Sequence, residues 1–163
     1  ELRIYSTIDG GSNWTQQFTV EDDFYAIYGC DMYSLDSLNC LLAVSNWPYL
    51  KIFRTIDGGN NWIEISQLQN IDFQLGNIEF ISTTEGWITS ALGMIHYTSD
   101  GGYSWNPKHK SVTTKNLYSL DFVDEDNGWA IGGASPSEEN ILIKKERIKT
   151  EEELQIFKRL LFF

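Results

Sequence analysis

Along most of the chain, apolar residues fall in short runs that are separated by Gly, Asn, Asp and Ser. Such runs are typical of β-strands, whereas an amphipathic helix repeats its apolar residues at about every third or fourth position over a longer stretch. The runs predict thirteen strands in four units: two strands in residues 1–20, four in 24–68, four in 75–110 and three in 117–145. In the second unit, we expect the first strand at residues 24–28, before a long loop.

Three segments share the pattern T-x-D-G-G-x-x-W, at residues 7–14, 55–62 and 98–105. Each segment follows a strand-like run, and the aspartates at 9, 57 and 100 are 48 and 43 residues apart. Repeats of about this length that are built from short strands indicate a β-propeller rather than a helical solenoid.

The residue types of the repeated segment suit a tight turn between two strands. Adjacent glycines can adopt positive φ without a clash of a Cβ atom. The aspartate carboxylate can accept hydrogen bonds from nearby backbone amides, and the tryptophan can lie over the turn. A phosphate-binding or metal-binding loop would need a lysine or further ligands at a fixed offset, and none recurs. We therefore expect a structural role for Asp9, Gly10, Gly11, Trp14, Asp57, Gly58, Gly59, Trp62, Asp100, Gly101, Gly102 and Trp105.

The segment resembles the Asp-box, or BNR repeat, of sialidase-like β-propellers. A second part of the repeat resembles the propellers of the photosystem II assembly and stability factor type. Its residues are Ile78-Glu79-Phe80 with Glu85-Gly86-Trp87-Ile88, and Leu120-Asp121-Phe122 with Gly128-Trp129-Ala130-Ile131-Gly132. This resemblance covers about residues 1 to 143. It implies a propeller of four-stranded antiparallel blades, in which the Asp-boxes lie far from the ligand sites.

The predicted fold is therefore all-β, an incomplete propeller of about three to three and a half blades over residues 1–148. Closed propellers have about four to eight blades, so we expect a fragment that is completed by its remaining blades or by self-association. Residues 149–163 read as a short amphipathic helix that begins at Thr150 and carries Leu154 and Phe157 on one face. This segment is interpreted as a helix packed on the domain, as a non-native tail, or as a docking or membrane-surface helix.

Charge narrows the classes of partner. The chain has a formal net charge of −11, and residues 1–143 contain 19 of the 23 acidic side chains but only 6 of the 12 basic ones. Such an acidic body repels phosphate backbones, so we do not expect a nucleic-acid partner. No apolar run is long enough for a transmembrane helix. Cys30 and Cys40 suit either a disulfide or two buried thiols. An exported protein, extracellular or periplasmic, is favoured.

Alternating strand directions place the three repeated turns on one face of the propeller and the remaining loops on the other. Loops on a rigid scaffold concentrate binding residues. On that other face, Trp47 and Tyr49 flank a proline and are the candidate contacts for a protein or carbohydrate partner. The alternative for Trp47 is packing between neighbouring blades.

No catalytic, metal or cofactor site is predicted. Sialidases combine convergent arginines with a tyrosine and an acid, but Arg3, Arg54, Arg147 and Arg159 occupy no recurring position. The acids at 121, 124, 125 and 126 miss the spacing of a calcium loop, and His96 and His109 lack nearby partner ligands in the sequence. We expect a non-catalytic binding or assembly scaffold that resembles the photosystem II assembly factor. The alternative is a fragment of a sialidase-like glycoside hydrolase whose catalytic residues lie outside this chain.

Overall fold

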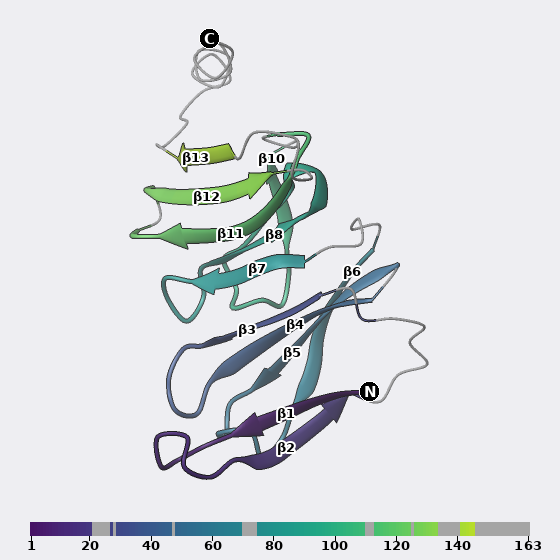
Figure 1. Ribbon diagram of the computed structural model, residues 1–163, viewed down its shortest axis with the longest axis vertical. Coiled ribbons are helices and arrows are strands. Elements are labelled where there is room, and N and C mark those ends of the chain that lie inside the picture. The colour runs from purple at the N-terminus through teal and green to yellow at the C-terminus, as the bar shows by residue number, and fades with distance from the viewer. Residues whose placement is uncertain are drawn as a thin grey trace.

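The computed structural model describes residues 1–20, 27, 29–46, 48–69, 75–109, 113–124, 126–133 and 141–145. These residues form thirteen strands and one short 3-10 helix (Figure 1). The strands are β1 (Leu2–Ser6), β2 (Thr15–Val20), β3 (Gly29–Ser34), β4 (Cys40–Asn46), β5 (Tyr49–Thr55), β6 (Ile63–Gln69), β7 (Leu75–Phe80), β8 (Gly86–Ser90), β9 (Ile95–Thr98), β10 (Asn106–His109), β11 (Asn116–Phe122), β12 (Gly128–Gly133) and β13 (Ile141–Lys145), with η1 (Ala91–Gly93) between β8 and β9.

The strands form four antiparallel sheets in chain order: β1–β2, β3–β6, β7–β10 and β11–β13. In each sheet, neighbours in the sequence are neighbours in space. Figure 1 shows the sheets stacked one on another, from β1–β2 at the bottom to β11–β13 at the top. This arrangement confirms the predicted all-β fold with two, four, four and three strands.

The first strand of the second sheet differs from the prediction. β3 covers Gly29–Ser34, where a long loop was predicted, and its pairing with β4 runs from Gly29 opposite Ser45 to Ser34 opposite Cys40. The connection is therefore a tight turn, in which Asp36 Oδ1 accepts hydrogen bonds from two backbone N–H groups that follow it. Most of residues 24–28 and all of the predicted helix at 149–163 lie outside the described residues.

Apolar side chains fill the space between successive sheets. One cluster packs β1–β2 on β3–β6, a second packs β3–β6 on β7–β10, and a third packs β7–β10 on β11–β13. In the third cluster, Trp87 is 1% exposed and its ring stacks on Phe122 with centroids 3.9 Å apart. Both faces of an internal sheet are therefore buried.

The first strands of the sheets, β3, β7 and β11, lie side by side. Side chains of one strand accept hydrogen bonds from the backbone of the next. Asp31 Oδ2 accepts from the Ile78 N–H at 2.9 Å, and Asn77 Oδ1 accepts from the Leu120 N–H at 3.0 Å. Two residues further along both strands, Glu79 Oε1 accepts from the Phe122 N–H at 3.1 Å. These contacts fix the register between sheets.

The three repeated segments, which we call DGG turns, connect β1 to β2, β5 to β6 and β9 to β10. Both glycines of each turn have positive φ, between 70° and 93°. In the second turn, Asp57 Oδ1 accepts from Thr55 Oγ1 at 2.9 Å and from the Asn61 N–H at 2.9 Å. Thr55 Oγ1 in turn accepts from the Gly59 N–H at 2.9 Å. The same contacts recur in the other two turns.

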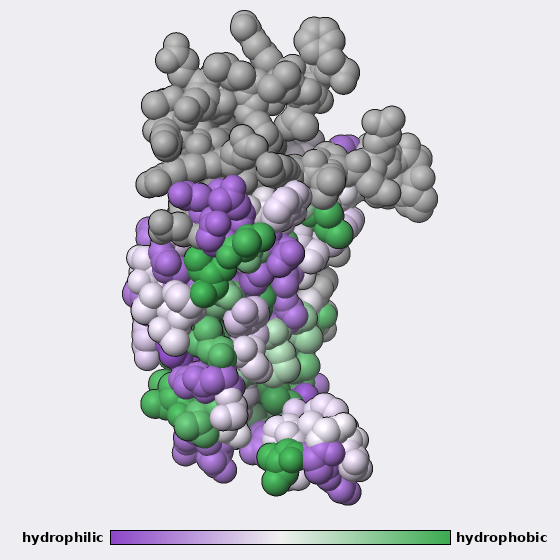
Figure 2. Space-filling model, turned by 90° about the vertical axis from the view of Figure 1, so that its left-hand side faces the viewer, coloured by the Kyte–Doolittle hydropathy of each residue, from purple (hydrophilic) through white to green (hydrophobic). Residues whose placement is uncertain are grey.

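The DGG turns share one side of the molecule, the turn face, with the tight turns that follow β3, β7 and β11. This face lies on the left of Figure 1 and toward the viewer in Figure 2, where apolar patches alternate with hydrophilic ones. Neighbouring turns are joined, since the Gly58 N–H donates to Leu38 O at 2.9 Å and the Gly101 N–H donates to Thr84 O at 2.8 Å. Trp14 lies over its turn but is 61% exposed, because no sheet packs on that side among the described residues.

We expect Thr55→Val to lower the free energy of unfolding by about 1–3 kcal/mol, because the buried Gly59 N–H loses its acceptor. Thr7→Val removes the same contacts from a more exposed turn, where water can replace them, and should cost less. Urea denaturation of both variants measures the difference. Equal losses would show that burial does not determine the contribution of the turn.

Candidate functional site

The loop face lies opposite the turn face and carries the end of β4, the start of β5 and the η1 turn between β8 and β9 (Figure 1). Tyr49 begins β5 there, between Asn46 of β4 and Gln69 of β6, and is half-buried. Trp47 and residues 134–140 lie outside the described residues. Tyr49 is therefore placed on this face, and the role of Trp47 stays a prediction.

Leu92 in η1 lies on the same face as Tyr49, and no sequence motif predicts it as a candidate contact residue. Its backbone is left-handed (φ 56°, ψ 26°), which is uncommon for a residue with a Cβ atom and costs about 1–3 kcal/mol. Its N–H donates to Asn116 Oδ1 at 3.1 Å. The next residue, Gly93, also has positive φ, and a Cβ atom there would lie 2.3 Å from Thr113 O. The turn is thus held against the segment before β11, with the Leu92 side chain 48% exposed.

Two buried polar side chains near this end of the β7–β10 sheet have no hydrogen-bond partner among the described residues. They are Ser90, whose Oγ is unpaired, and His96, with both ring nitrogens unpaired. His96 is 5% exposed, and burial lowers its pKa because the charged imidazolium is poorly solvated there. His96 is therefore a buried side chain that is neutral at neutral pH.

This burial predicts an acid-sensitive stability. Because the folded pKa of His96 lies below the unfolded value of about 6.5, the unfolded state binds the proton first and stability falls as the pH drops below about 6.5. The variant His96→Phe carries the residue found at the equivalent position of β5, Phe53, and should show a smaller decline. Urea midpoints at about pH 7.5 and pH 5.5 test this, because the two proteins differ only at position 96 and all other titrating groups are shared. Equal declines in the two proteins would contradict it.

Asp31 of β3 and Glu79 of β7 have structural roles, because each accepts a backbone N–H of the next sheet. Burial raises the pKa of Glu79, the Phe122 N–H opposes that rise, and the negative charge of Asp121 adds to it. A carboxyl group with a raised pKa beside a second carboxyl group is the pairing that glycosidases use. Here, however, Glu79 already holds the backbone of β11.

The two arginines among the described residues belong to different sheets and do not converge. Arg54 Nη1 donates to Gly101 O at 3.1 Å, and its guanidinium lies 5.9 Å from the Tyr103 ring centroid. Arg54 therefore ties the β3–β6 sheet to the third DGG turn. Arg147 and Arg159 lie outside the described residues.

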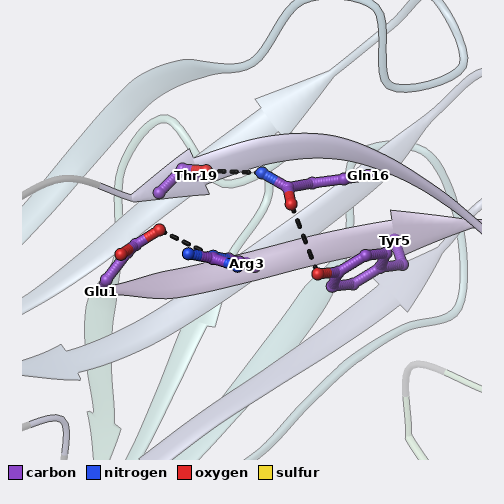
Figure 3. Close-up of polar contacts among 5 residues, drawn as sticks. All are labelled: Glu1, Arg3, Tyr5, Gln16 and Thr19. Atoms are coloured by element: carbon purple, nitrogen blue, oxygen red, sulfur yellow. Dashed lines mark hydrogen bonds and ion pairs between the residues drawn. The ribbon is translucent and has the colours of Figure 1, made fainter.

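Arg3 lies on the exposed side of the β1–β2 sheet, where Figure 3 shows two separate groups of polar contacts. Arg3 Nε donates to Glu1 Oε1 at 2.7 Å, and Tyr5 Oη donates to Gln16 Oε1 at 3.3 Å. Gln16 Nε2 then donates to Thr19 Oγ1 at 3.0 Å. The Glu1–Arg3 pair and the Tyr5–Gln16–Thr19 group lie on one side of the hairpin and, apart from the half-buried Thr19, are exposed, so they form no enclosed site.

Within the described ranges, no group of three or more His, Cys, Asp or Glu side chains could hold a metal ion. Asp124 instead closes the β11–β12 turn by accepting from the N–H groups of Asp126 and Asn127, each at 2.8 Å. Cys30 and Cys40 are free thiols, and burial raises the pKa of Cys40. In the part of the chain that the structure describes, no helix is long and apolar enough to cross a bilayer.

Successive antiparallel sheets, stacked through their first strands, define the chain as part of a β-propeller. No protein-family model matches it. It is 32% identical over 66 residues to the chloroplastic photosystem II stability/assembly factor HCF136 of Arabidopsis thaliana, a match that covers 40% of this chain and 16% of HCF136.

Solved structures share the fold. YCF48 from Cyanidioschyzon merolae superimposes with a TM-score of 0.63 and 15% identity, over 88% of this chain and 44% of that chain. A YCF48 bound to D1 peptide superimposes with a TM-score of 0.57 and 17% identity, over 91% and 48% of the two chains. The GH74 enzyme of Niastella koreensis gives a TM-score of 0.55 and 16% identity, over 74% and 21%. The chain thus spans less than half the length of the YCF48 chains that it matches.

Proposed function

We propose that this chain is a non-catalytic propeller scaffold that binds a protein segment through its loop face. The observation that carries the proposal is the shared fold with a YCF48 bound to D1 peptide, over 91% of this chain. The local similarity to HCF136 supports the same assignment. A carbohydrate partner is the second option for this face.

The use of the described charged side chains supports a binding role over catalysis. Asp31 and Glu79 hold neighbouring strands, the aspartates of the turns accept backbone N–H groups, and Arg54 is bound to Gly101. These groups already have intramolecular partners. The loop face, in contrast, presents Tyr49 and the exposed Leu92 on a rigid sheet framework. Aromatic and aliphatic side chains that are held in place suit the side chains of an extended peptide.

The binding proposal is tested with a fluorescently labelled D1 peptide and its scrambled counterpart. Fluorescence polarisation should show binding of the native sequence, and Tyr49→Ala should weaken it at least several-fold through loss of an aromatic contact. Val123→Ser, which changes an exposed apolar residue of the turn face, is the matched control and should bind normally. Equal polarisation with both peptides, or an unchanged Tyr49→Ala variant, would remove the proposal.

A second candidate is a piece of a glycoside hydrolase, favoured by the similarity to the Niastella koreensis GH74 enzyme and by the raised pKa of Glu79. Incubation with sialosides and aryl glycosides tests it. We expect no turnover from this chain. Turnover that disappears in Glu79→Gln, while circular dichroism stays unchanged, would establish a hydrolase and overturn the scaffold assignment.

A further inference from the structure

The η1 turn contains a leucine in a conformation that this protein otherwise gives to glycine. Leu92 has φ 56° and ψ 26°, and every other positive φ among the described residues belongs to a glycine. A residue with a Cβ atom is strained in this region, whereas glycine adopts it freely. The backbone geometry of the turn therefore gives no reason for a leucine at this position.

Hydrogen bonds from two sides hold the turn in this conformation. Within the turn, the Ser90 N–H donates to Met94 O at 3.0 Å, and the Met94 N–H donates to Ala91 O at 3.3 Å. From the next sheet, Asn116 Oδ1 accepts the Leu92 N–H at 3.1 Å. A strained backbone persists where its surroundings over-determine it, and such residues cluster at ligand-binding sites.

The residue after Leu92 shows how closely the next segment approaches the turn. Gly93 also has positive φ, and a Cβ atom there would lie 2.3 Å from Thr113 O. The segment before β11 therefore packs directly on the backbone of the turn. η1 also contacts β11 itself. Leu92 is thus held at the junction of two successive sheets, on the loop face.

Leu92 occupies the place in its sheet that Tyr49 occupies in the preceding sheet. Strand pairing defines this equivalence, because Thr55 of β5 and Thr98 of β9 each end a third strand opposite the first residue of the second strand. Tyr49 precedes Thr55 by six residues, and Leu92 precedes Thr98 by the same number. An aromatic and an aliphatic side chain therefore lie at equivalent places on adjacent sheets.

We propose that the η1 turn is a preset apolar subsite of the loop face, in which Leu92 contacts an apolar side chain of an extended protein segment. Asn116 is its positioning residue, because it binds the Leu92 backbone and so fixes the direction of that side chain. An extended segment that crosses from the β3–β6 sheet to the β7–β10 sheet meets Tyr49 and then Leu92. This inference rests on the proposed function and deepens it.

A strained backbone has a use at such a subsite. Leu92 is 48% exposed, so about half of its surface faces solvent while its backbone is fixed by the next sheet. A contact residue that is already held in its bound position loses little conformational entropy when the partner binds. A leucine on a mobile loop would present the same surface but would lose more entropy on binding.

The test measures stability and D1-peptide polarisation in matched variants of Leu92. Leu92→Gly and Leu92→Ala both remove the apolar side chain and differ from each other only in the Cβ atom. The urea midpoint of Leu92→Gly should exceed that of Leu92→Ala, because only alanine keeps the strain. Both variants should bind the peptide at least several-fold more weakly. Leu92→Met keeps a flexible apolar side chain and should retain the affinity of the unaltered chain.

Asn116→Ala tests the positioning role in a double-mutant cycle. In the unaltered background it should weaken peptide binding, because the Leu92 N–H loses its acceptor. In the Leu92→Gly background the same substitution should leave the remaining affinity unchanged, because no side chain is left to position. A purely structural role of Asn116 predicts equal losses in both backgrounds. Ile56→Ala removes a 66% exposed apolar side chain of the turn face and, as the matched control, should bind normally.

The outcomes separate this inference from the proposed function. Normal peptide binding by Leu92→Gly and Leu92→Ala, beside a weakened Tyr49→Ala variant, would overturn the subsite and leave the proposed function standing. Equal polarisation of the native and scrambled peptides with the unaltered chain would remove both. A urea midpoint of Leu92→Gly below that of Leu92→Ala would contradict the strained backbone and with it the preset subsite. Circular dichroism checks that each variant is folded before its binding is compared.

Discussion

The structure depends on the burial of each sheet against the next. A four-stranded sheet of this protein is apolar on both sides, so a single sheet leaves one large hydrophobic surface in water whichever side it packs on. Leu41 and Ala43 on one side of the β3–β6 sheet and Leu42 and Val44 on the other are all nearly or fully buried. Stability therefore belongs to the stack, and the contacts of Asp31 and Asn77 with the following strand fix the alignment that this packing requires.

This dependence explains why the most recognisable residues lie away from the loop face. The DGG turns end each outer hairpin, and Thr55 and Thr98 are buried where their hydroxyl groups hold the glycine amides. Such a turn fixes the geometry of two strands without using any group of the opposite face. A scaffold of this kind permits variation of the loops while its framework stays constant.

The sequence was sufficient for the architecture because local signals and the repeat agreed. The glycine pairs at 58–59 and 101–102 need positive φ, and the observed values follow. It was insufficient where pairing between strands decides. A loop was predicted from residue 29 onward, but the pairing with β4 makes Gly29–Ser34 a strand. The exposure of Trp14 depends on whether a sheet packs beside it, and a motif does not encode that.

The candidate site was less accessible to sequence analysis. The sequence predicts Tyr49 as a contact because aromatic residues beside a proline are conspicuous. Leu92 was not recognised, because an ordinary leucine before a glycine gives no sign of a left-handed backbone. That conformation results from contacts with Thr113 and Asn116, which are distant in the sequence. The position of candidate contact residues on this fold therefore depends more on tertiary contacts than on sequence motifs.

The hydrogen-bonded aspartates of the turn face also have an electrostatic consequence. Hydrogen bonds from Asn13 and Thr7 lower the pKa of Asp9 to about 2, and the pKa values of Asp36, Asp57, Asp100 and Asp124 are lowered too. As the pH falls, carboxylates with ordinary pKa values become protonated at a higher pH than these five aspartates do. The molecule then becomes polarised, with anionic charge concentrated on one side. A positively charged support would adsorb it by that side and leave the loops facing outward.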